Sequence, residues 1–117
     1  MEGRPIGQPG GEAQTAGAKL TVVARIKAKP GMEARVKKEL LSLVALTRKE
    51  SGCLNYDLHQ ALDDKSAFVF YENWLSKKDL EKPLQMPYLQ AFLGKVDQIL
   101  AQPVEITLWK MISPEDK

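Results

Sequence analysis

The fold is decided by residues 66–74, SAFVFYENW, whose aromatic and β-branched side chains predict a β-strand. Side chains alternate between the two faces of a strand, so Phe68 and Phe70 point to the same side as Trp74. Residues 67–71 are nevertheless apolar on both faces, whereas a sheet with one face in water alternates apolar with polar residues. We therefore expect both faces of this strand to be buried.

Turn signals divide the neighbouring sequence into three more strands and three helices. The expected strands are residues 20–28, 53–61, 66–74 and 104–112. The expected helices are residues 32–51, about two turns that begin after a Ser76 N-cap and stop at Pro83, and a helix that starts at Pro87 and is closed by Pro103. The order β-α-β-β-α-α-β predicts an α+β fold, a split βαβ arrangement with helices on one side of an antiparallel sheet.

The helices can cover only one face of such a sheet. Residues 53–61 and 104–112 also carry apolar side chains on both faces, so the second face needs another cover. In a chain with no spare elements, the simplest cover is a second copy related by a two-fold axis. We therefore expect an obligate homodimer packed sheet to sheet.

Composition divides the chain into a tail and one domain. Five of the eight glycines and two of the seven prolines fall within the first 17 residues, so residues 1–19 are expected to be a disordered tail. Either an expression scar or a dispensable natural extension would fit this composition. Residues 20–112 form the expected domain, and residues 113–117 a polar C-terminal end.

Scarce residue types exclude several classes of function. The chain has one His and one Cys, whereas a zinc site needs three or four protein ligands, so only a carboxylate-dominated metal site would remain possible. Neither GxxxxGK[ST] nor GxGxxG occurs, which removes the usual support for a nucleotide cofactor. We expect no cofactor and no metal.

Charge and hydropathy restrict the partners and the location. Lys and Arg number 17 against 15 Asp and Glu, too small an excess for a nucleic-acid partner. No apolar run is long enough for a signal peptide or a membrane span, so no membrane partner is expected. The lone Cys53 cannot form an intrachain disulfide, and a reducing, cytoplasmic location is therefore expected.

The chain resembles the antibiotic biosynthesis monooxygenase family over residues 20–112. The matching segments are LTVVARIKAKPG, ESGCLNYDLHQALDD, FVFYENW and MPYLQAF, and the most specific elements are Gly52-Cys53-Leu54 with Tyr56 and the Glu72-x-Trp74 pair. The resemblance implies a ferredoxin-like fold, a dimeric α/β barrel and, in catalytic members, oxidation of quinols or related aromatics by O₂ without metal or flavin. Other members degrade haem or handle small signalling molecules.

The chain departs from this family at positions that often carry chemistry. Members look as if they often carry a histidine near the places that Pro83 and Tyr88 occupy here. Members that tailor aromatic polyketides have an Asn and a Tyr where this chain has Phe70 and Leu80. Of that polyketide set, only the tryptophan carries over, as Trp74.

Cofactor-free oxygenation requires a base, a donor for developing negative charge and aromatic walls around the substrate. Glu72 and Trp74 lie two residues apart on one strand face and offer a carboxylate and an indole N–H. His59 is a second candidate base because imidazole side chains commonly act as general bases in enzymes. The candidate substrate-binding residues are Asn55, Phe68, Phe70 and Tyr88.

Each of these residues also has a structural interpretation. Glu72 could satisfy neighbouring backbone or Arg groups, and Trp74 could be ordinary core. His59 could be a partly solvated residue at a strand end, and the register of the hairpin decides whether it faces Glu72 at all.

The leading hypothesis is a cytoplasmic, homodimeric, cofactor-independent monooxygenase that oxidises a quinol or small aromatic substrate with O₂. The alternative is a non-catalytic dimer of the same fold that binds a small ligand or acts in stress. Haem degradation is a third choice.

Overall fold

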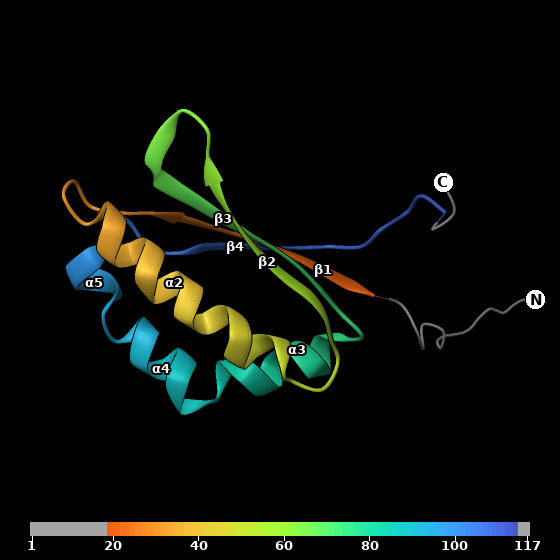
Figure 1. The fold of residues 1–117 in the computed structure, drawn as a ribbon. Helices are drawn as coiled ribbons and strands as arrows, with labels where there is room; N and C mark the ends of the chain where they lie inside the picture. Colours follow the sequence, from red (N-terminus) through yellow and green to blue (C-terminus); the bar gives the residue numbers. More distant parts are fainter. Residues whose placement is uncertain (1–18, 115–117) are drawn as a thin grey trace, which may run out of the picture.

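The computed structural model describes residues 19–114, which form four strands and four helices. The strands are β1 (Leu20–Lys27), β2 (Cys53–Ala61), β3 (Asp64–Trp74) and β4 (Glu105–Trp109). The helices are α2 (Glu33–Arg48), α3 (Lys77–Leu84), α4 (Pro87–Leu93) and α5 (Val96–Ile99). The strands form one antiparallel sheet in the order β2-β3-β1-β4, with the helices on one face (Figure 1). The predicted α+β fold is confirmed, and the expected tail, residues 1–19, falls outside the described residues except for Lys19.

The two central strands supply most of the sheet's part of the core. In β1, Val22, Ala24 and Ile26 are buried, and in β3 Phe68 and Phe70 are buried. The antiparallel register places Val22 opposite Glu72 and Ile26 opposite Phe68, so these side chains share the face that the helices cover. We call this the helix face of the sheet and the other the open face.

Helix α2 packs against the helix face through one stripe of side chains. Val36, Leu40, Leu43 and Thr47 are its buried residues and recur at helical spacing. Gly52, with φ +87°, turns the chain from the end of this helix into β2. The stripe predicted within residues 32–51 is therefore confirmed, although the helix itself is shorter than that range.

The short helix after β3 is capped as the sequence predicts. The Asp79 backbone N–H donates to Ser76 Oγ at 3.2 Å, which satisfies one of the free amides of the first turn. Pro83 lies in the last turn of α3 and is fully buried, consistent with a helix of two turns.

The expected helix between Pro87 and Pro103 is broken into α4 and α5 around Gly94. After α5 the chain returns to the sheet, where the Ala101 backbone N–H donates to the Lys27 carbonyl at 2.8 Å. The break buries both Phe92 and Ile99, and a single straight helix could not also deliver the chain to β1. The last strand, β4, spans Glu105–Trp109 and is shorter than the expected residues 104–112.

Within residues 19–114, no helix is both long enough and apolar enough to span a membrane.

Candidate functional site

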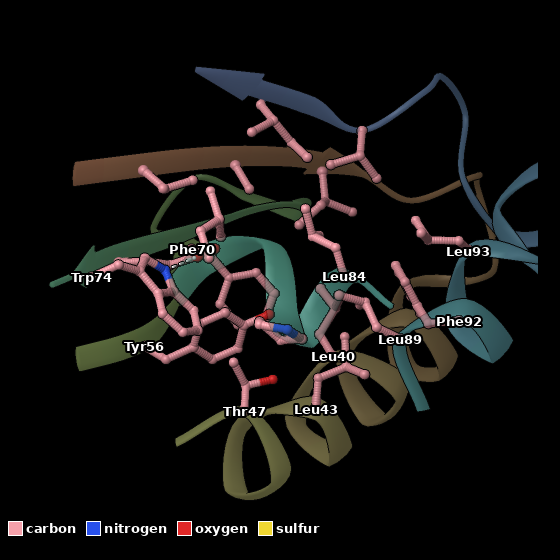
Figure 2. A pocket seen from close by; sticks show the side chains of 18 residues that line it. Leu40, Leu43, Thr47, Tyr56, Phe70, Trp74, Leu84, Leu89, Phe92 and Leu93 are labelled. Carbon is pink, nitrogen blue, oxygen red and sulfur yellow. Dashed lines mark hydrogen bonds between the residues drawn. The ribbon is translucent and has the colours of Figure 1, made fainter. Parts of the chain in front are cut away.

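A largely apolar cavity lies between the helix face of the sheet and the helix layer. Its empty space, including the part open to solvent, is about 720 Å³. Figure 2 shows two ends: Trp74, Tyr56, Phe70 and Thr47 gather at one, and Leu84, Leu89, Phe92 and Leu93 lie toward the other. The cavity opens where its lining residues Leu84, Leu93 and Ile106 are exposed, between α3–α4 and β4.

Glu72 places a carboxyl group in this apolar site. The side chain is 5% exposed, and its Oε1 accepts a hydrogen bond of 2.9 Å from Trp74 Nε1. Burial raises the pKa of Glu72 to about 7, and the hydrogen bond from Trp74 opposes part of that rise. The group therefore exchanges a proton near neutral pH, as a general base must.

Two stacked rings form a wall beside this carboxyl. Tyr56 and Phe70 have ring centroids 4.4 Å apart with planes 29° from parallel. The β2–β3 register places Tyr56 directly opposite Glu72, and the pKa of Tyr56 is raised first by burial and then by the nearby Glu72 charge. The Tyr56 phenol therefore stays protonated and can donate a hydrogen bond at neutral pH.

The sheet separates the predicted site residues into two groups. Glu72, Trp74 and Phe70 line the cavity together. Asn55 and His59 lie on the open face, opposite Asn73 and Val69, where the Asn55 amide donates to Asp57 Oδ2 at 3.1 Å. The structure therefore does not bring His59 or Asn55 to the carboxyl of Glu72.

The physical reason for this separation is a β-bulge at the start of β2. Cys53 is paired with Trp74, but Asn55 is paired with Asn73, so Leu54 is an extra residue on this strand. Continuous pairing from Cys53 would have placed His59 opposite Phe68, on the helix face. A shift of one residue reverses the face of every later side chain.

The two remaining candidates lie at the edges of the site. Phe68 is buried on the helix face but does not line the cavity. Tyr88, at the start of α4, donates a hydrogen bond from its hydroxyl to Glu50 Oε2 at 2.8 Å, which ties α4 to the turn between α2 and β2. Burial, followed by this carboxylate, raises the pKa of Tyr88 to about 12.

Sequence reasoning did not select Thr47 or Tyr56 as site residues. Both line the cavity, and Thr47 is almost completely buried. A hydroxyl within the apolar stripe of α2 was the available signal for Thr47. For Tyr56 the signal was its alternation with Leu58 on the helix face.

In the described part of the chain, the titratable side chains do not cluster as metal ligands do. Among residues 19–114, no group of three or more His, Cys, Asp or Glu side chains is placed to hold a metal ion. The cavity offers instead one carboxyl of pKa near 7, an indole N–H, hydroxyl groups and aromatic walls. This arrangement can bind a planar aromatic molecule and take a proton from it.

The chain matches known proteins over most of its length. Residues 19–95 match the family described as antibiotic biosynthesis monooxygenase. An uncharacterized protein of Synechocystis is 30% identical over 79% of this chain, and the match spans 63% of that protein, less than two thirds of its length. "Putative monooxygenase Rv0793" of Mycobacterium tuberculosis is 27% identical over 76% of this chain and 87% of its own length.

One solved structure is similar to this chain in both fold and sequence. The crystal structure of PA3566 from Pseudomonas aeruginosa has a TM-score of 0.79 and 34% identity, and it covers 84% of this chain and 98% of that one. The family match alone extends over more than half of the residues. The chain therefore belongs to the antibiotic biosynthesis monooxygenase family.

Proposed function

We propose that this protein is a cofactor-independent monooxygenase that oxidises a quinol or a small aromatic substrate with O₂. The observation that carries the proposal is the buried Glu72 carboxyl, held by Trp74 and with a pKa of about 7, at the end of an apolar cavity. A base of this strength suits the removal of a phenolic proton at neutral pH. The family membership supports the same reaction class.

The proposed reaction begins when Glu72 accepts a proton from a substrate hydroxyl. The resulting anion is electron-rich and passes an electron to O₂, and the two radicals then combine. For a quinol, one oxygen atom enters the ring and the other leaves as water, so quinol plus O₂ gives a hydroxyquinone plus water. The substrate supplies every electron, and the protein supplies the base, the aromatic walls and the exclusion of water.

Assembly and location belong to the same proposal. We propose a cytoplasmic homodimer in which two open faces pack together, leaving each cavity on the outer side of its own sheet. This arrangement would hold β3, and with it Glu72 and Trp74, in the rigid centre of the assembly.

Oxygen consumption with a panel of quinols tests the reaction. We expect turnover in the presence of EDTA, with one ¹⁸O atom from ¹⁸O₂ in each product molecule. Substitution of Glu72 by Gln should lower kcat/KM by about 10²- to 10⁴-fold, the usual contribution of a general base. Quinol oxidation with no ¹⁸O in the product would exclude a monooxygenase.

Three further variants, compared with Glu72→Gln, test which residue is the base. Glu81→Gln is the matched control, because it removes an exposed carboxylate of α3 and should leave turnover unchanged. Trp74→Phe removes the hydrogen bond that lowers the pKa of Glu72, so the pH dependence of turnover should move to higher pH. Loss of turnover in His59→Gln but not in Glu72→Gln would contradict the assignment of Glu72 as the base.

Binding of quinols across the panel without turnover would favour the alternative function, a non-catalytic ligand-binding dimer.

A further inference from the structure

One polar group at the cavity makes no hydrogen bond. Among the buried side-chain nitrogen and oxygen atoms of residues 19–114, Thr47 Oγ1 is the one that has no hydrogen-bond partner. The Thr47 side chain is 1% exposed, so bulk water does not solvate it. A buried hydroxyl without a partner disfavours the folded state and requires an explanation.

Helical threonines normally avoid this situation. A threonine within a helix can donate its hydroxyl hydrogen to the carbonyl one turn earlier, which here is that of Leu43. Thr47 makes no such bond, although it lies in the last turns of the regular helix α2. The hydroxyl therefore remains available at the cavity wall, beside Tyr56 (Figure 2).

Other hydroxyl groups lie near Thr47 without satisfying it. Thr47 acts to lower the pKa of both Tyr56 and Tyr88, against the larger effect of burial, so both phenols are close. Neither forms a hydrogen bond of acceptable geometry with Oγ1. The Tyr88 hydroxyl is already committed to Glu50, at 2.8 Å. The helix-side wall of the cavity thus carries a polar spot next to apolar Leu40 and Leu43.

The two polar spots of the cavity come from different layers of the fold. Glu72 belongs to β3 and Thr47 to α2, so they project from the sheet wall and the helix wall respectively. Most of the remaining lining is aliphatic or aromatic. A planar ligand between these walls would meet a proton acceptor on one side and a hydroxyl on the other.

We infer that Thr47 is a specificity-determining residue, whose hydroxyl binds a second oxygen atom of a ligand whose first hydroxyl lies beside Glu72. The inference rests on the proposed function for the position of the first hydroxyl. It predicts that the cavity binds aromatic compounds with two oxygen substituents more tightly than those with one. A site that hydrogen-bonds a ligand hydroxyl discriminates strongly against the analogue that lacks it, because its own group is then left unpaired.

The test measures binding under anaerobic conditions, so that no turnover intervenes. The probes are 1,4-naphthohydroquinone, with two hydroxyls, and 1-naphthol, with one, titrated calorimetrically into the wild type, Thr47→Val and Thr47→Ser. Valine has nearly the shape of threonine without the hydroxyl, and serine keeps the hydroxyl. We expect the wild type to bind the hydroquinone about tenfold or more tightly than the naphthol. Thr47→Val should lose most of that preference through weaker hydroquinone binding, and Thr47→Ser should retain it.

Thermal unfolding of the unliganded variants separates this role from a structural one. If Thr47 lacks a partner in the unliganded protein, Thr47→Val should leave the melting temperature unchanged or raise it. A lower melting temperature with an unchanged ligand preference would show that the hydroxyl has a structural partner, and would overturn the inference.

The inference and the proposed function can fail separately. Hydroquinone binding that depends on Thr47, without oxygen consumption, would overturn the function and leave the inference standing. Oxygen consumption with equal ligand preference in the wild type and Thr47→Val would do the reverse. If the wild type bound neither probe, both would be overturned.

Discussion

The carboxyl group of Glu72 lies in surroundings that favour its neutral form. Burial in the apolar cavity raises its pKa from 4.5 to about 7, and the Trp74 N–H limits the rise. A carboxyl of this pKa is mostly protonated at pH 6 and mostly ionised at pH 8. The same residue therefore governs both the pH dependence of the proposed reaction and that of stability.

The first prediction concerns the pH dependence of turnover. The ionised form of Glu72 is the base, so kcat/KM should rise about tenfold per pH unit below pH 7 and level off above it. Initial rates of oxygen consumption from pH 5.5 to 8.5 would measure this, with the Glu72→Gln protein correcting for spontaneous quinol oxidation. A flat profile across this range, as a carboxyl with the ordinary pKa of 4.5 would give, would contradict a buried base.

The second prediction concerns stability. The folded pKa of Glu72 exceeds the unfolded value, so the folded state binds the proton more tightly. Its contribution to stability is fully present below pH 4.5 and is lost as the pH rises to about 7, by an amount on the order of 3 kcal/mol. Glu72→Gln removes this dependence, since glutamine does not ionise.

Chemical denaturation of both proteins would measure the difference. The free energy of unfolding of Glu72→Gln relative to the wild type should increase between pH 5 and pH 8. Glu81→Gln, an exposed position, should show no such trend. An equal difference at both pH values would mean that the carboxyl of Glu72 is not shifted.

Residue-level features could be predicted from sequence only where local geometry determines them. Glu72 and Trp74 share a face because strand side chains alternate, and no tertiary information is needed. The bulge at Leu54 decides on which face of the sheet His59 lies, and no local sequence pattern predicts that bulge. Thr47 is informative only because its burial leaves the hydroxyl without a partner, and burial of a single atom is a property of the folded chain.

At the scale of elements, one glycine sits in the turn from α2 into β2 and packs closely against α3. Gly52 has φ +87°, which side chains other than glycine rarely adopt, and a Cβ at this position would collide with the Asp79 side chain of α3. Its carbonyl also accepts a 2.9 Å hydrogen bond from the Leu75 backbone N–H. Three elements therefore meet at Gly52.

The third prediction uses a matched pair of glycines. Gly31 has nearly the same φ, +86°, but a Cβ there would meet no atom within 4 Å. Gly31→Ala should therefore cost only the backbone strain, about 1 kcal/mol of unfolding free energy, whereas Gly52→Ala should cost about 2 kcal/mol or more because of the collision. Urea denaturation would measure both. If both variants lost the same unfolding free energy, the Asp79 side chain would be able to move away from the new Cβ without destabilising the fold.

Element boundaries followed from sequence where a capping residue or turn marks them. Ser76 marks the start of α3, and the β2–β3 turn was expected within one or two residues of its position. The division into α4 and α5 was missed because Leu89, Phe92, Val96 and Ile99 keep helical spacing across Gly94. The need to return the chain to β1 overrides that local pattern.

At the scale of the whole molecule, the open face carries the main unexplained surface. Its residues include Tyr71, 46% exposed, and Trp109, 57% exposed, on β3 and β4. The helices lie on the other face, so no described element covers these side chains (Figure 1). Large exposed aromatics beside half-buried Val23 and Val69 are typical of a protein–protein interface.

The fourth prediction tests the proposed dimer through this face. Sedimentation equilibrium of the wild type at micromolar concentration should give twice the chain mass of 13.1 kDa. Tyr71→Glu combined with Trp109→Glu would place two charges from each copy in the interface, and unpaired buried charges should shift the protein toward the monomer mass.

Leu41→Glu is the matched control for that variant. Leu41 is an equally exposed apolar residue, 52%, but it lies on α2, away from the open face, so the charge should leave the dimer intact. Circular dichroism of each variant would show whether its monomers stay folded. Loss of the helix signal on dissociation is expected of an obligate dimer, because its separated chains are not stable. A wild type of 13.1 kDa at micromolar concentration would contradict the dimer. If Leu41→Glu dissociated the protein as readily as the double variant, the interface would include the outer surface of α2 and the assignment to the open face would be wrong.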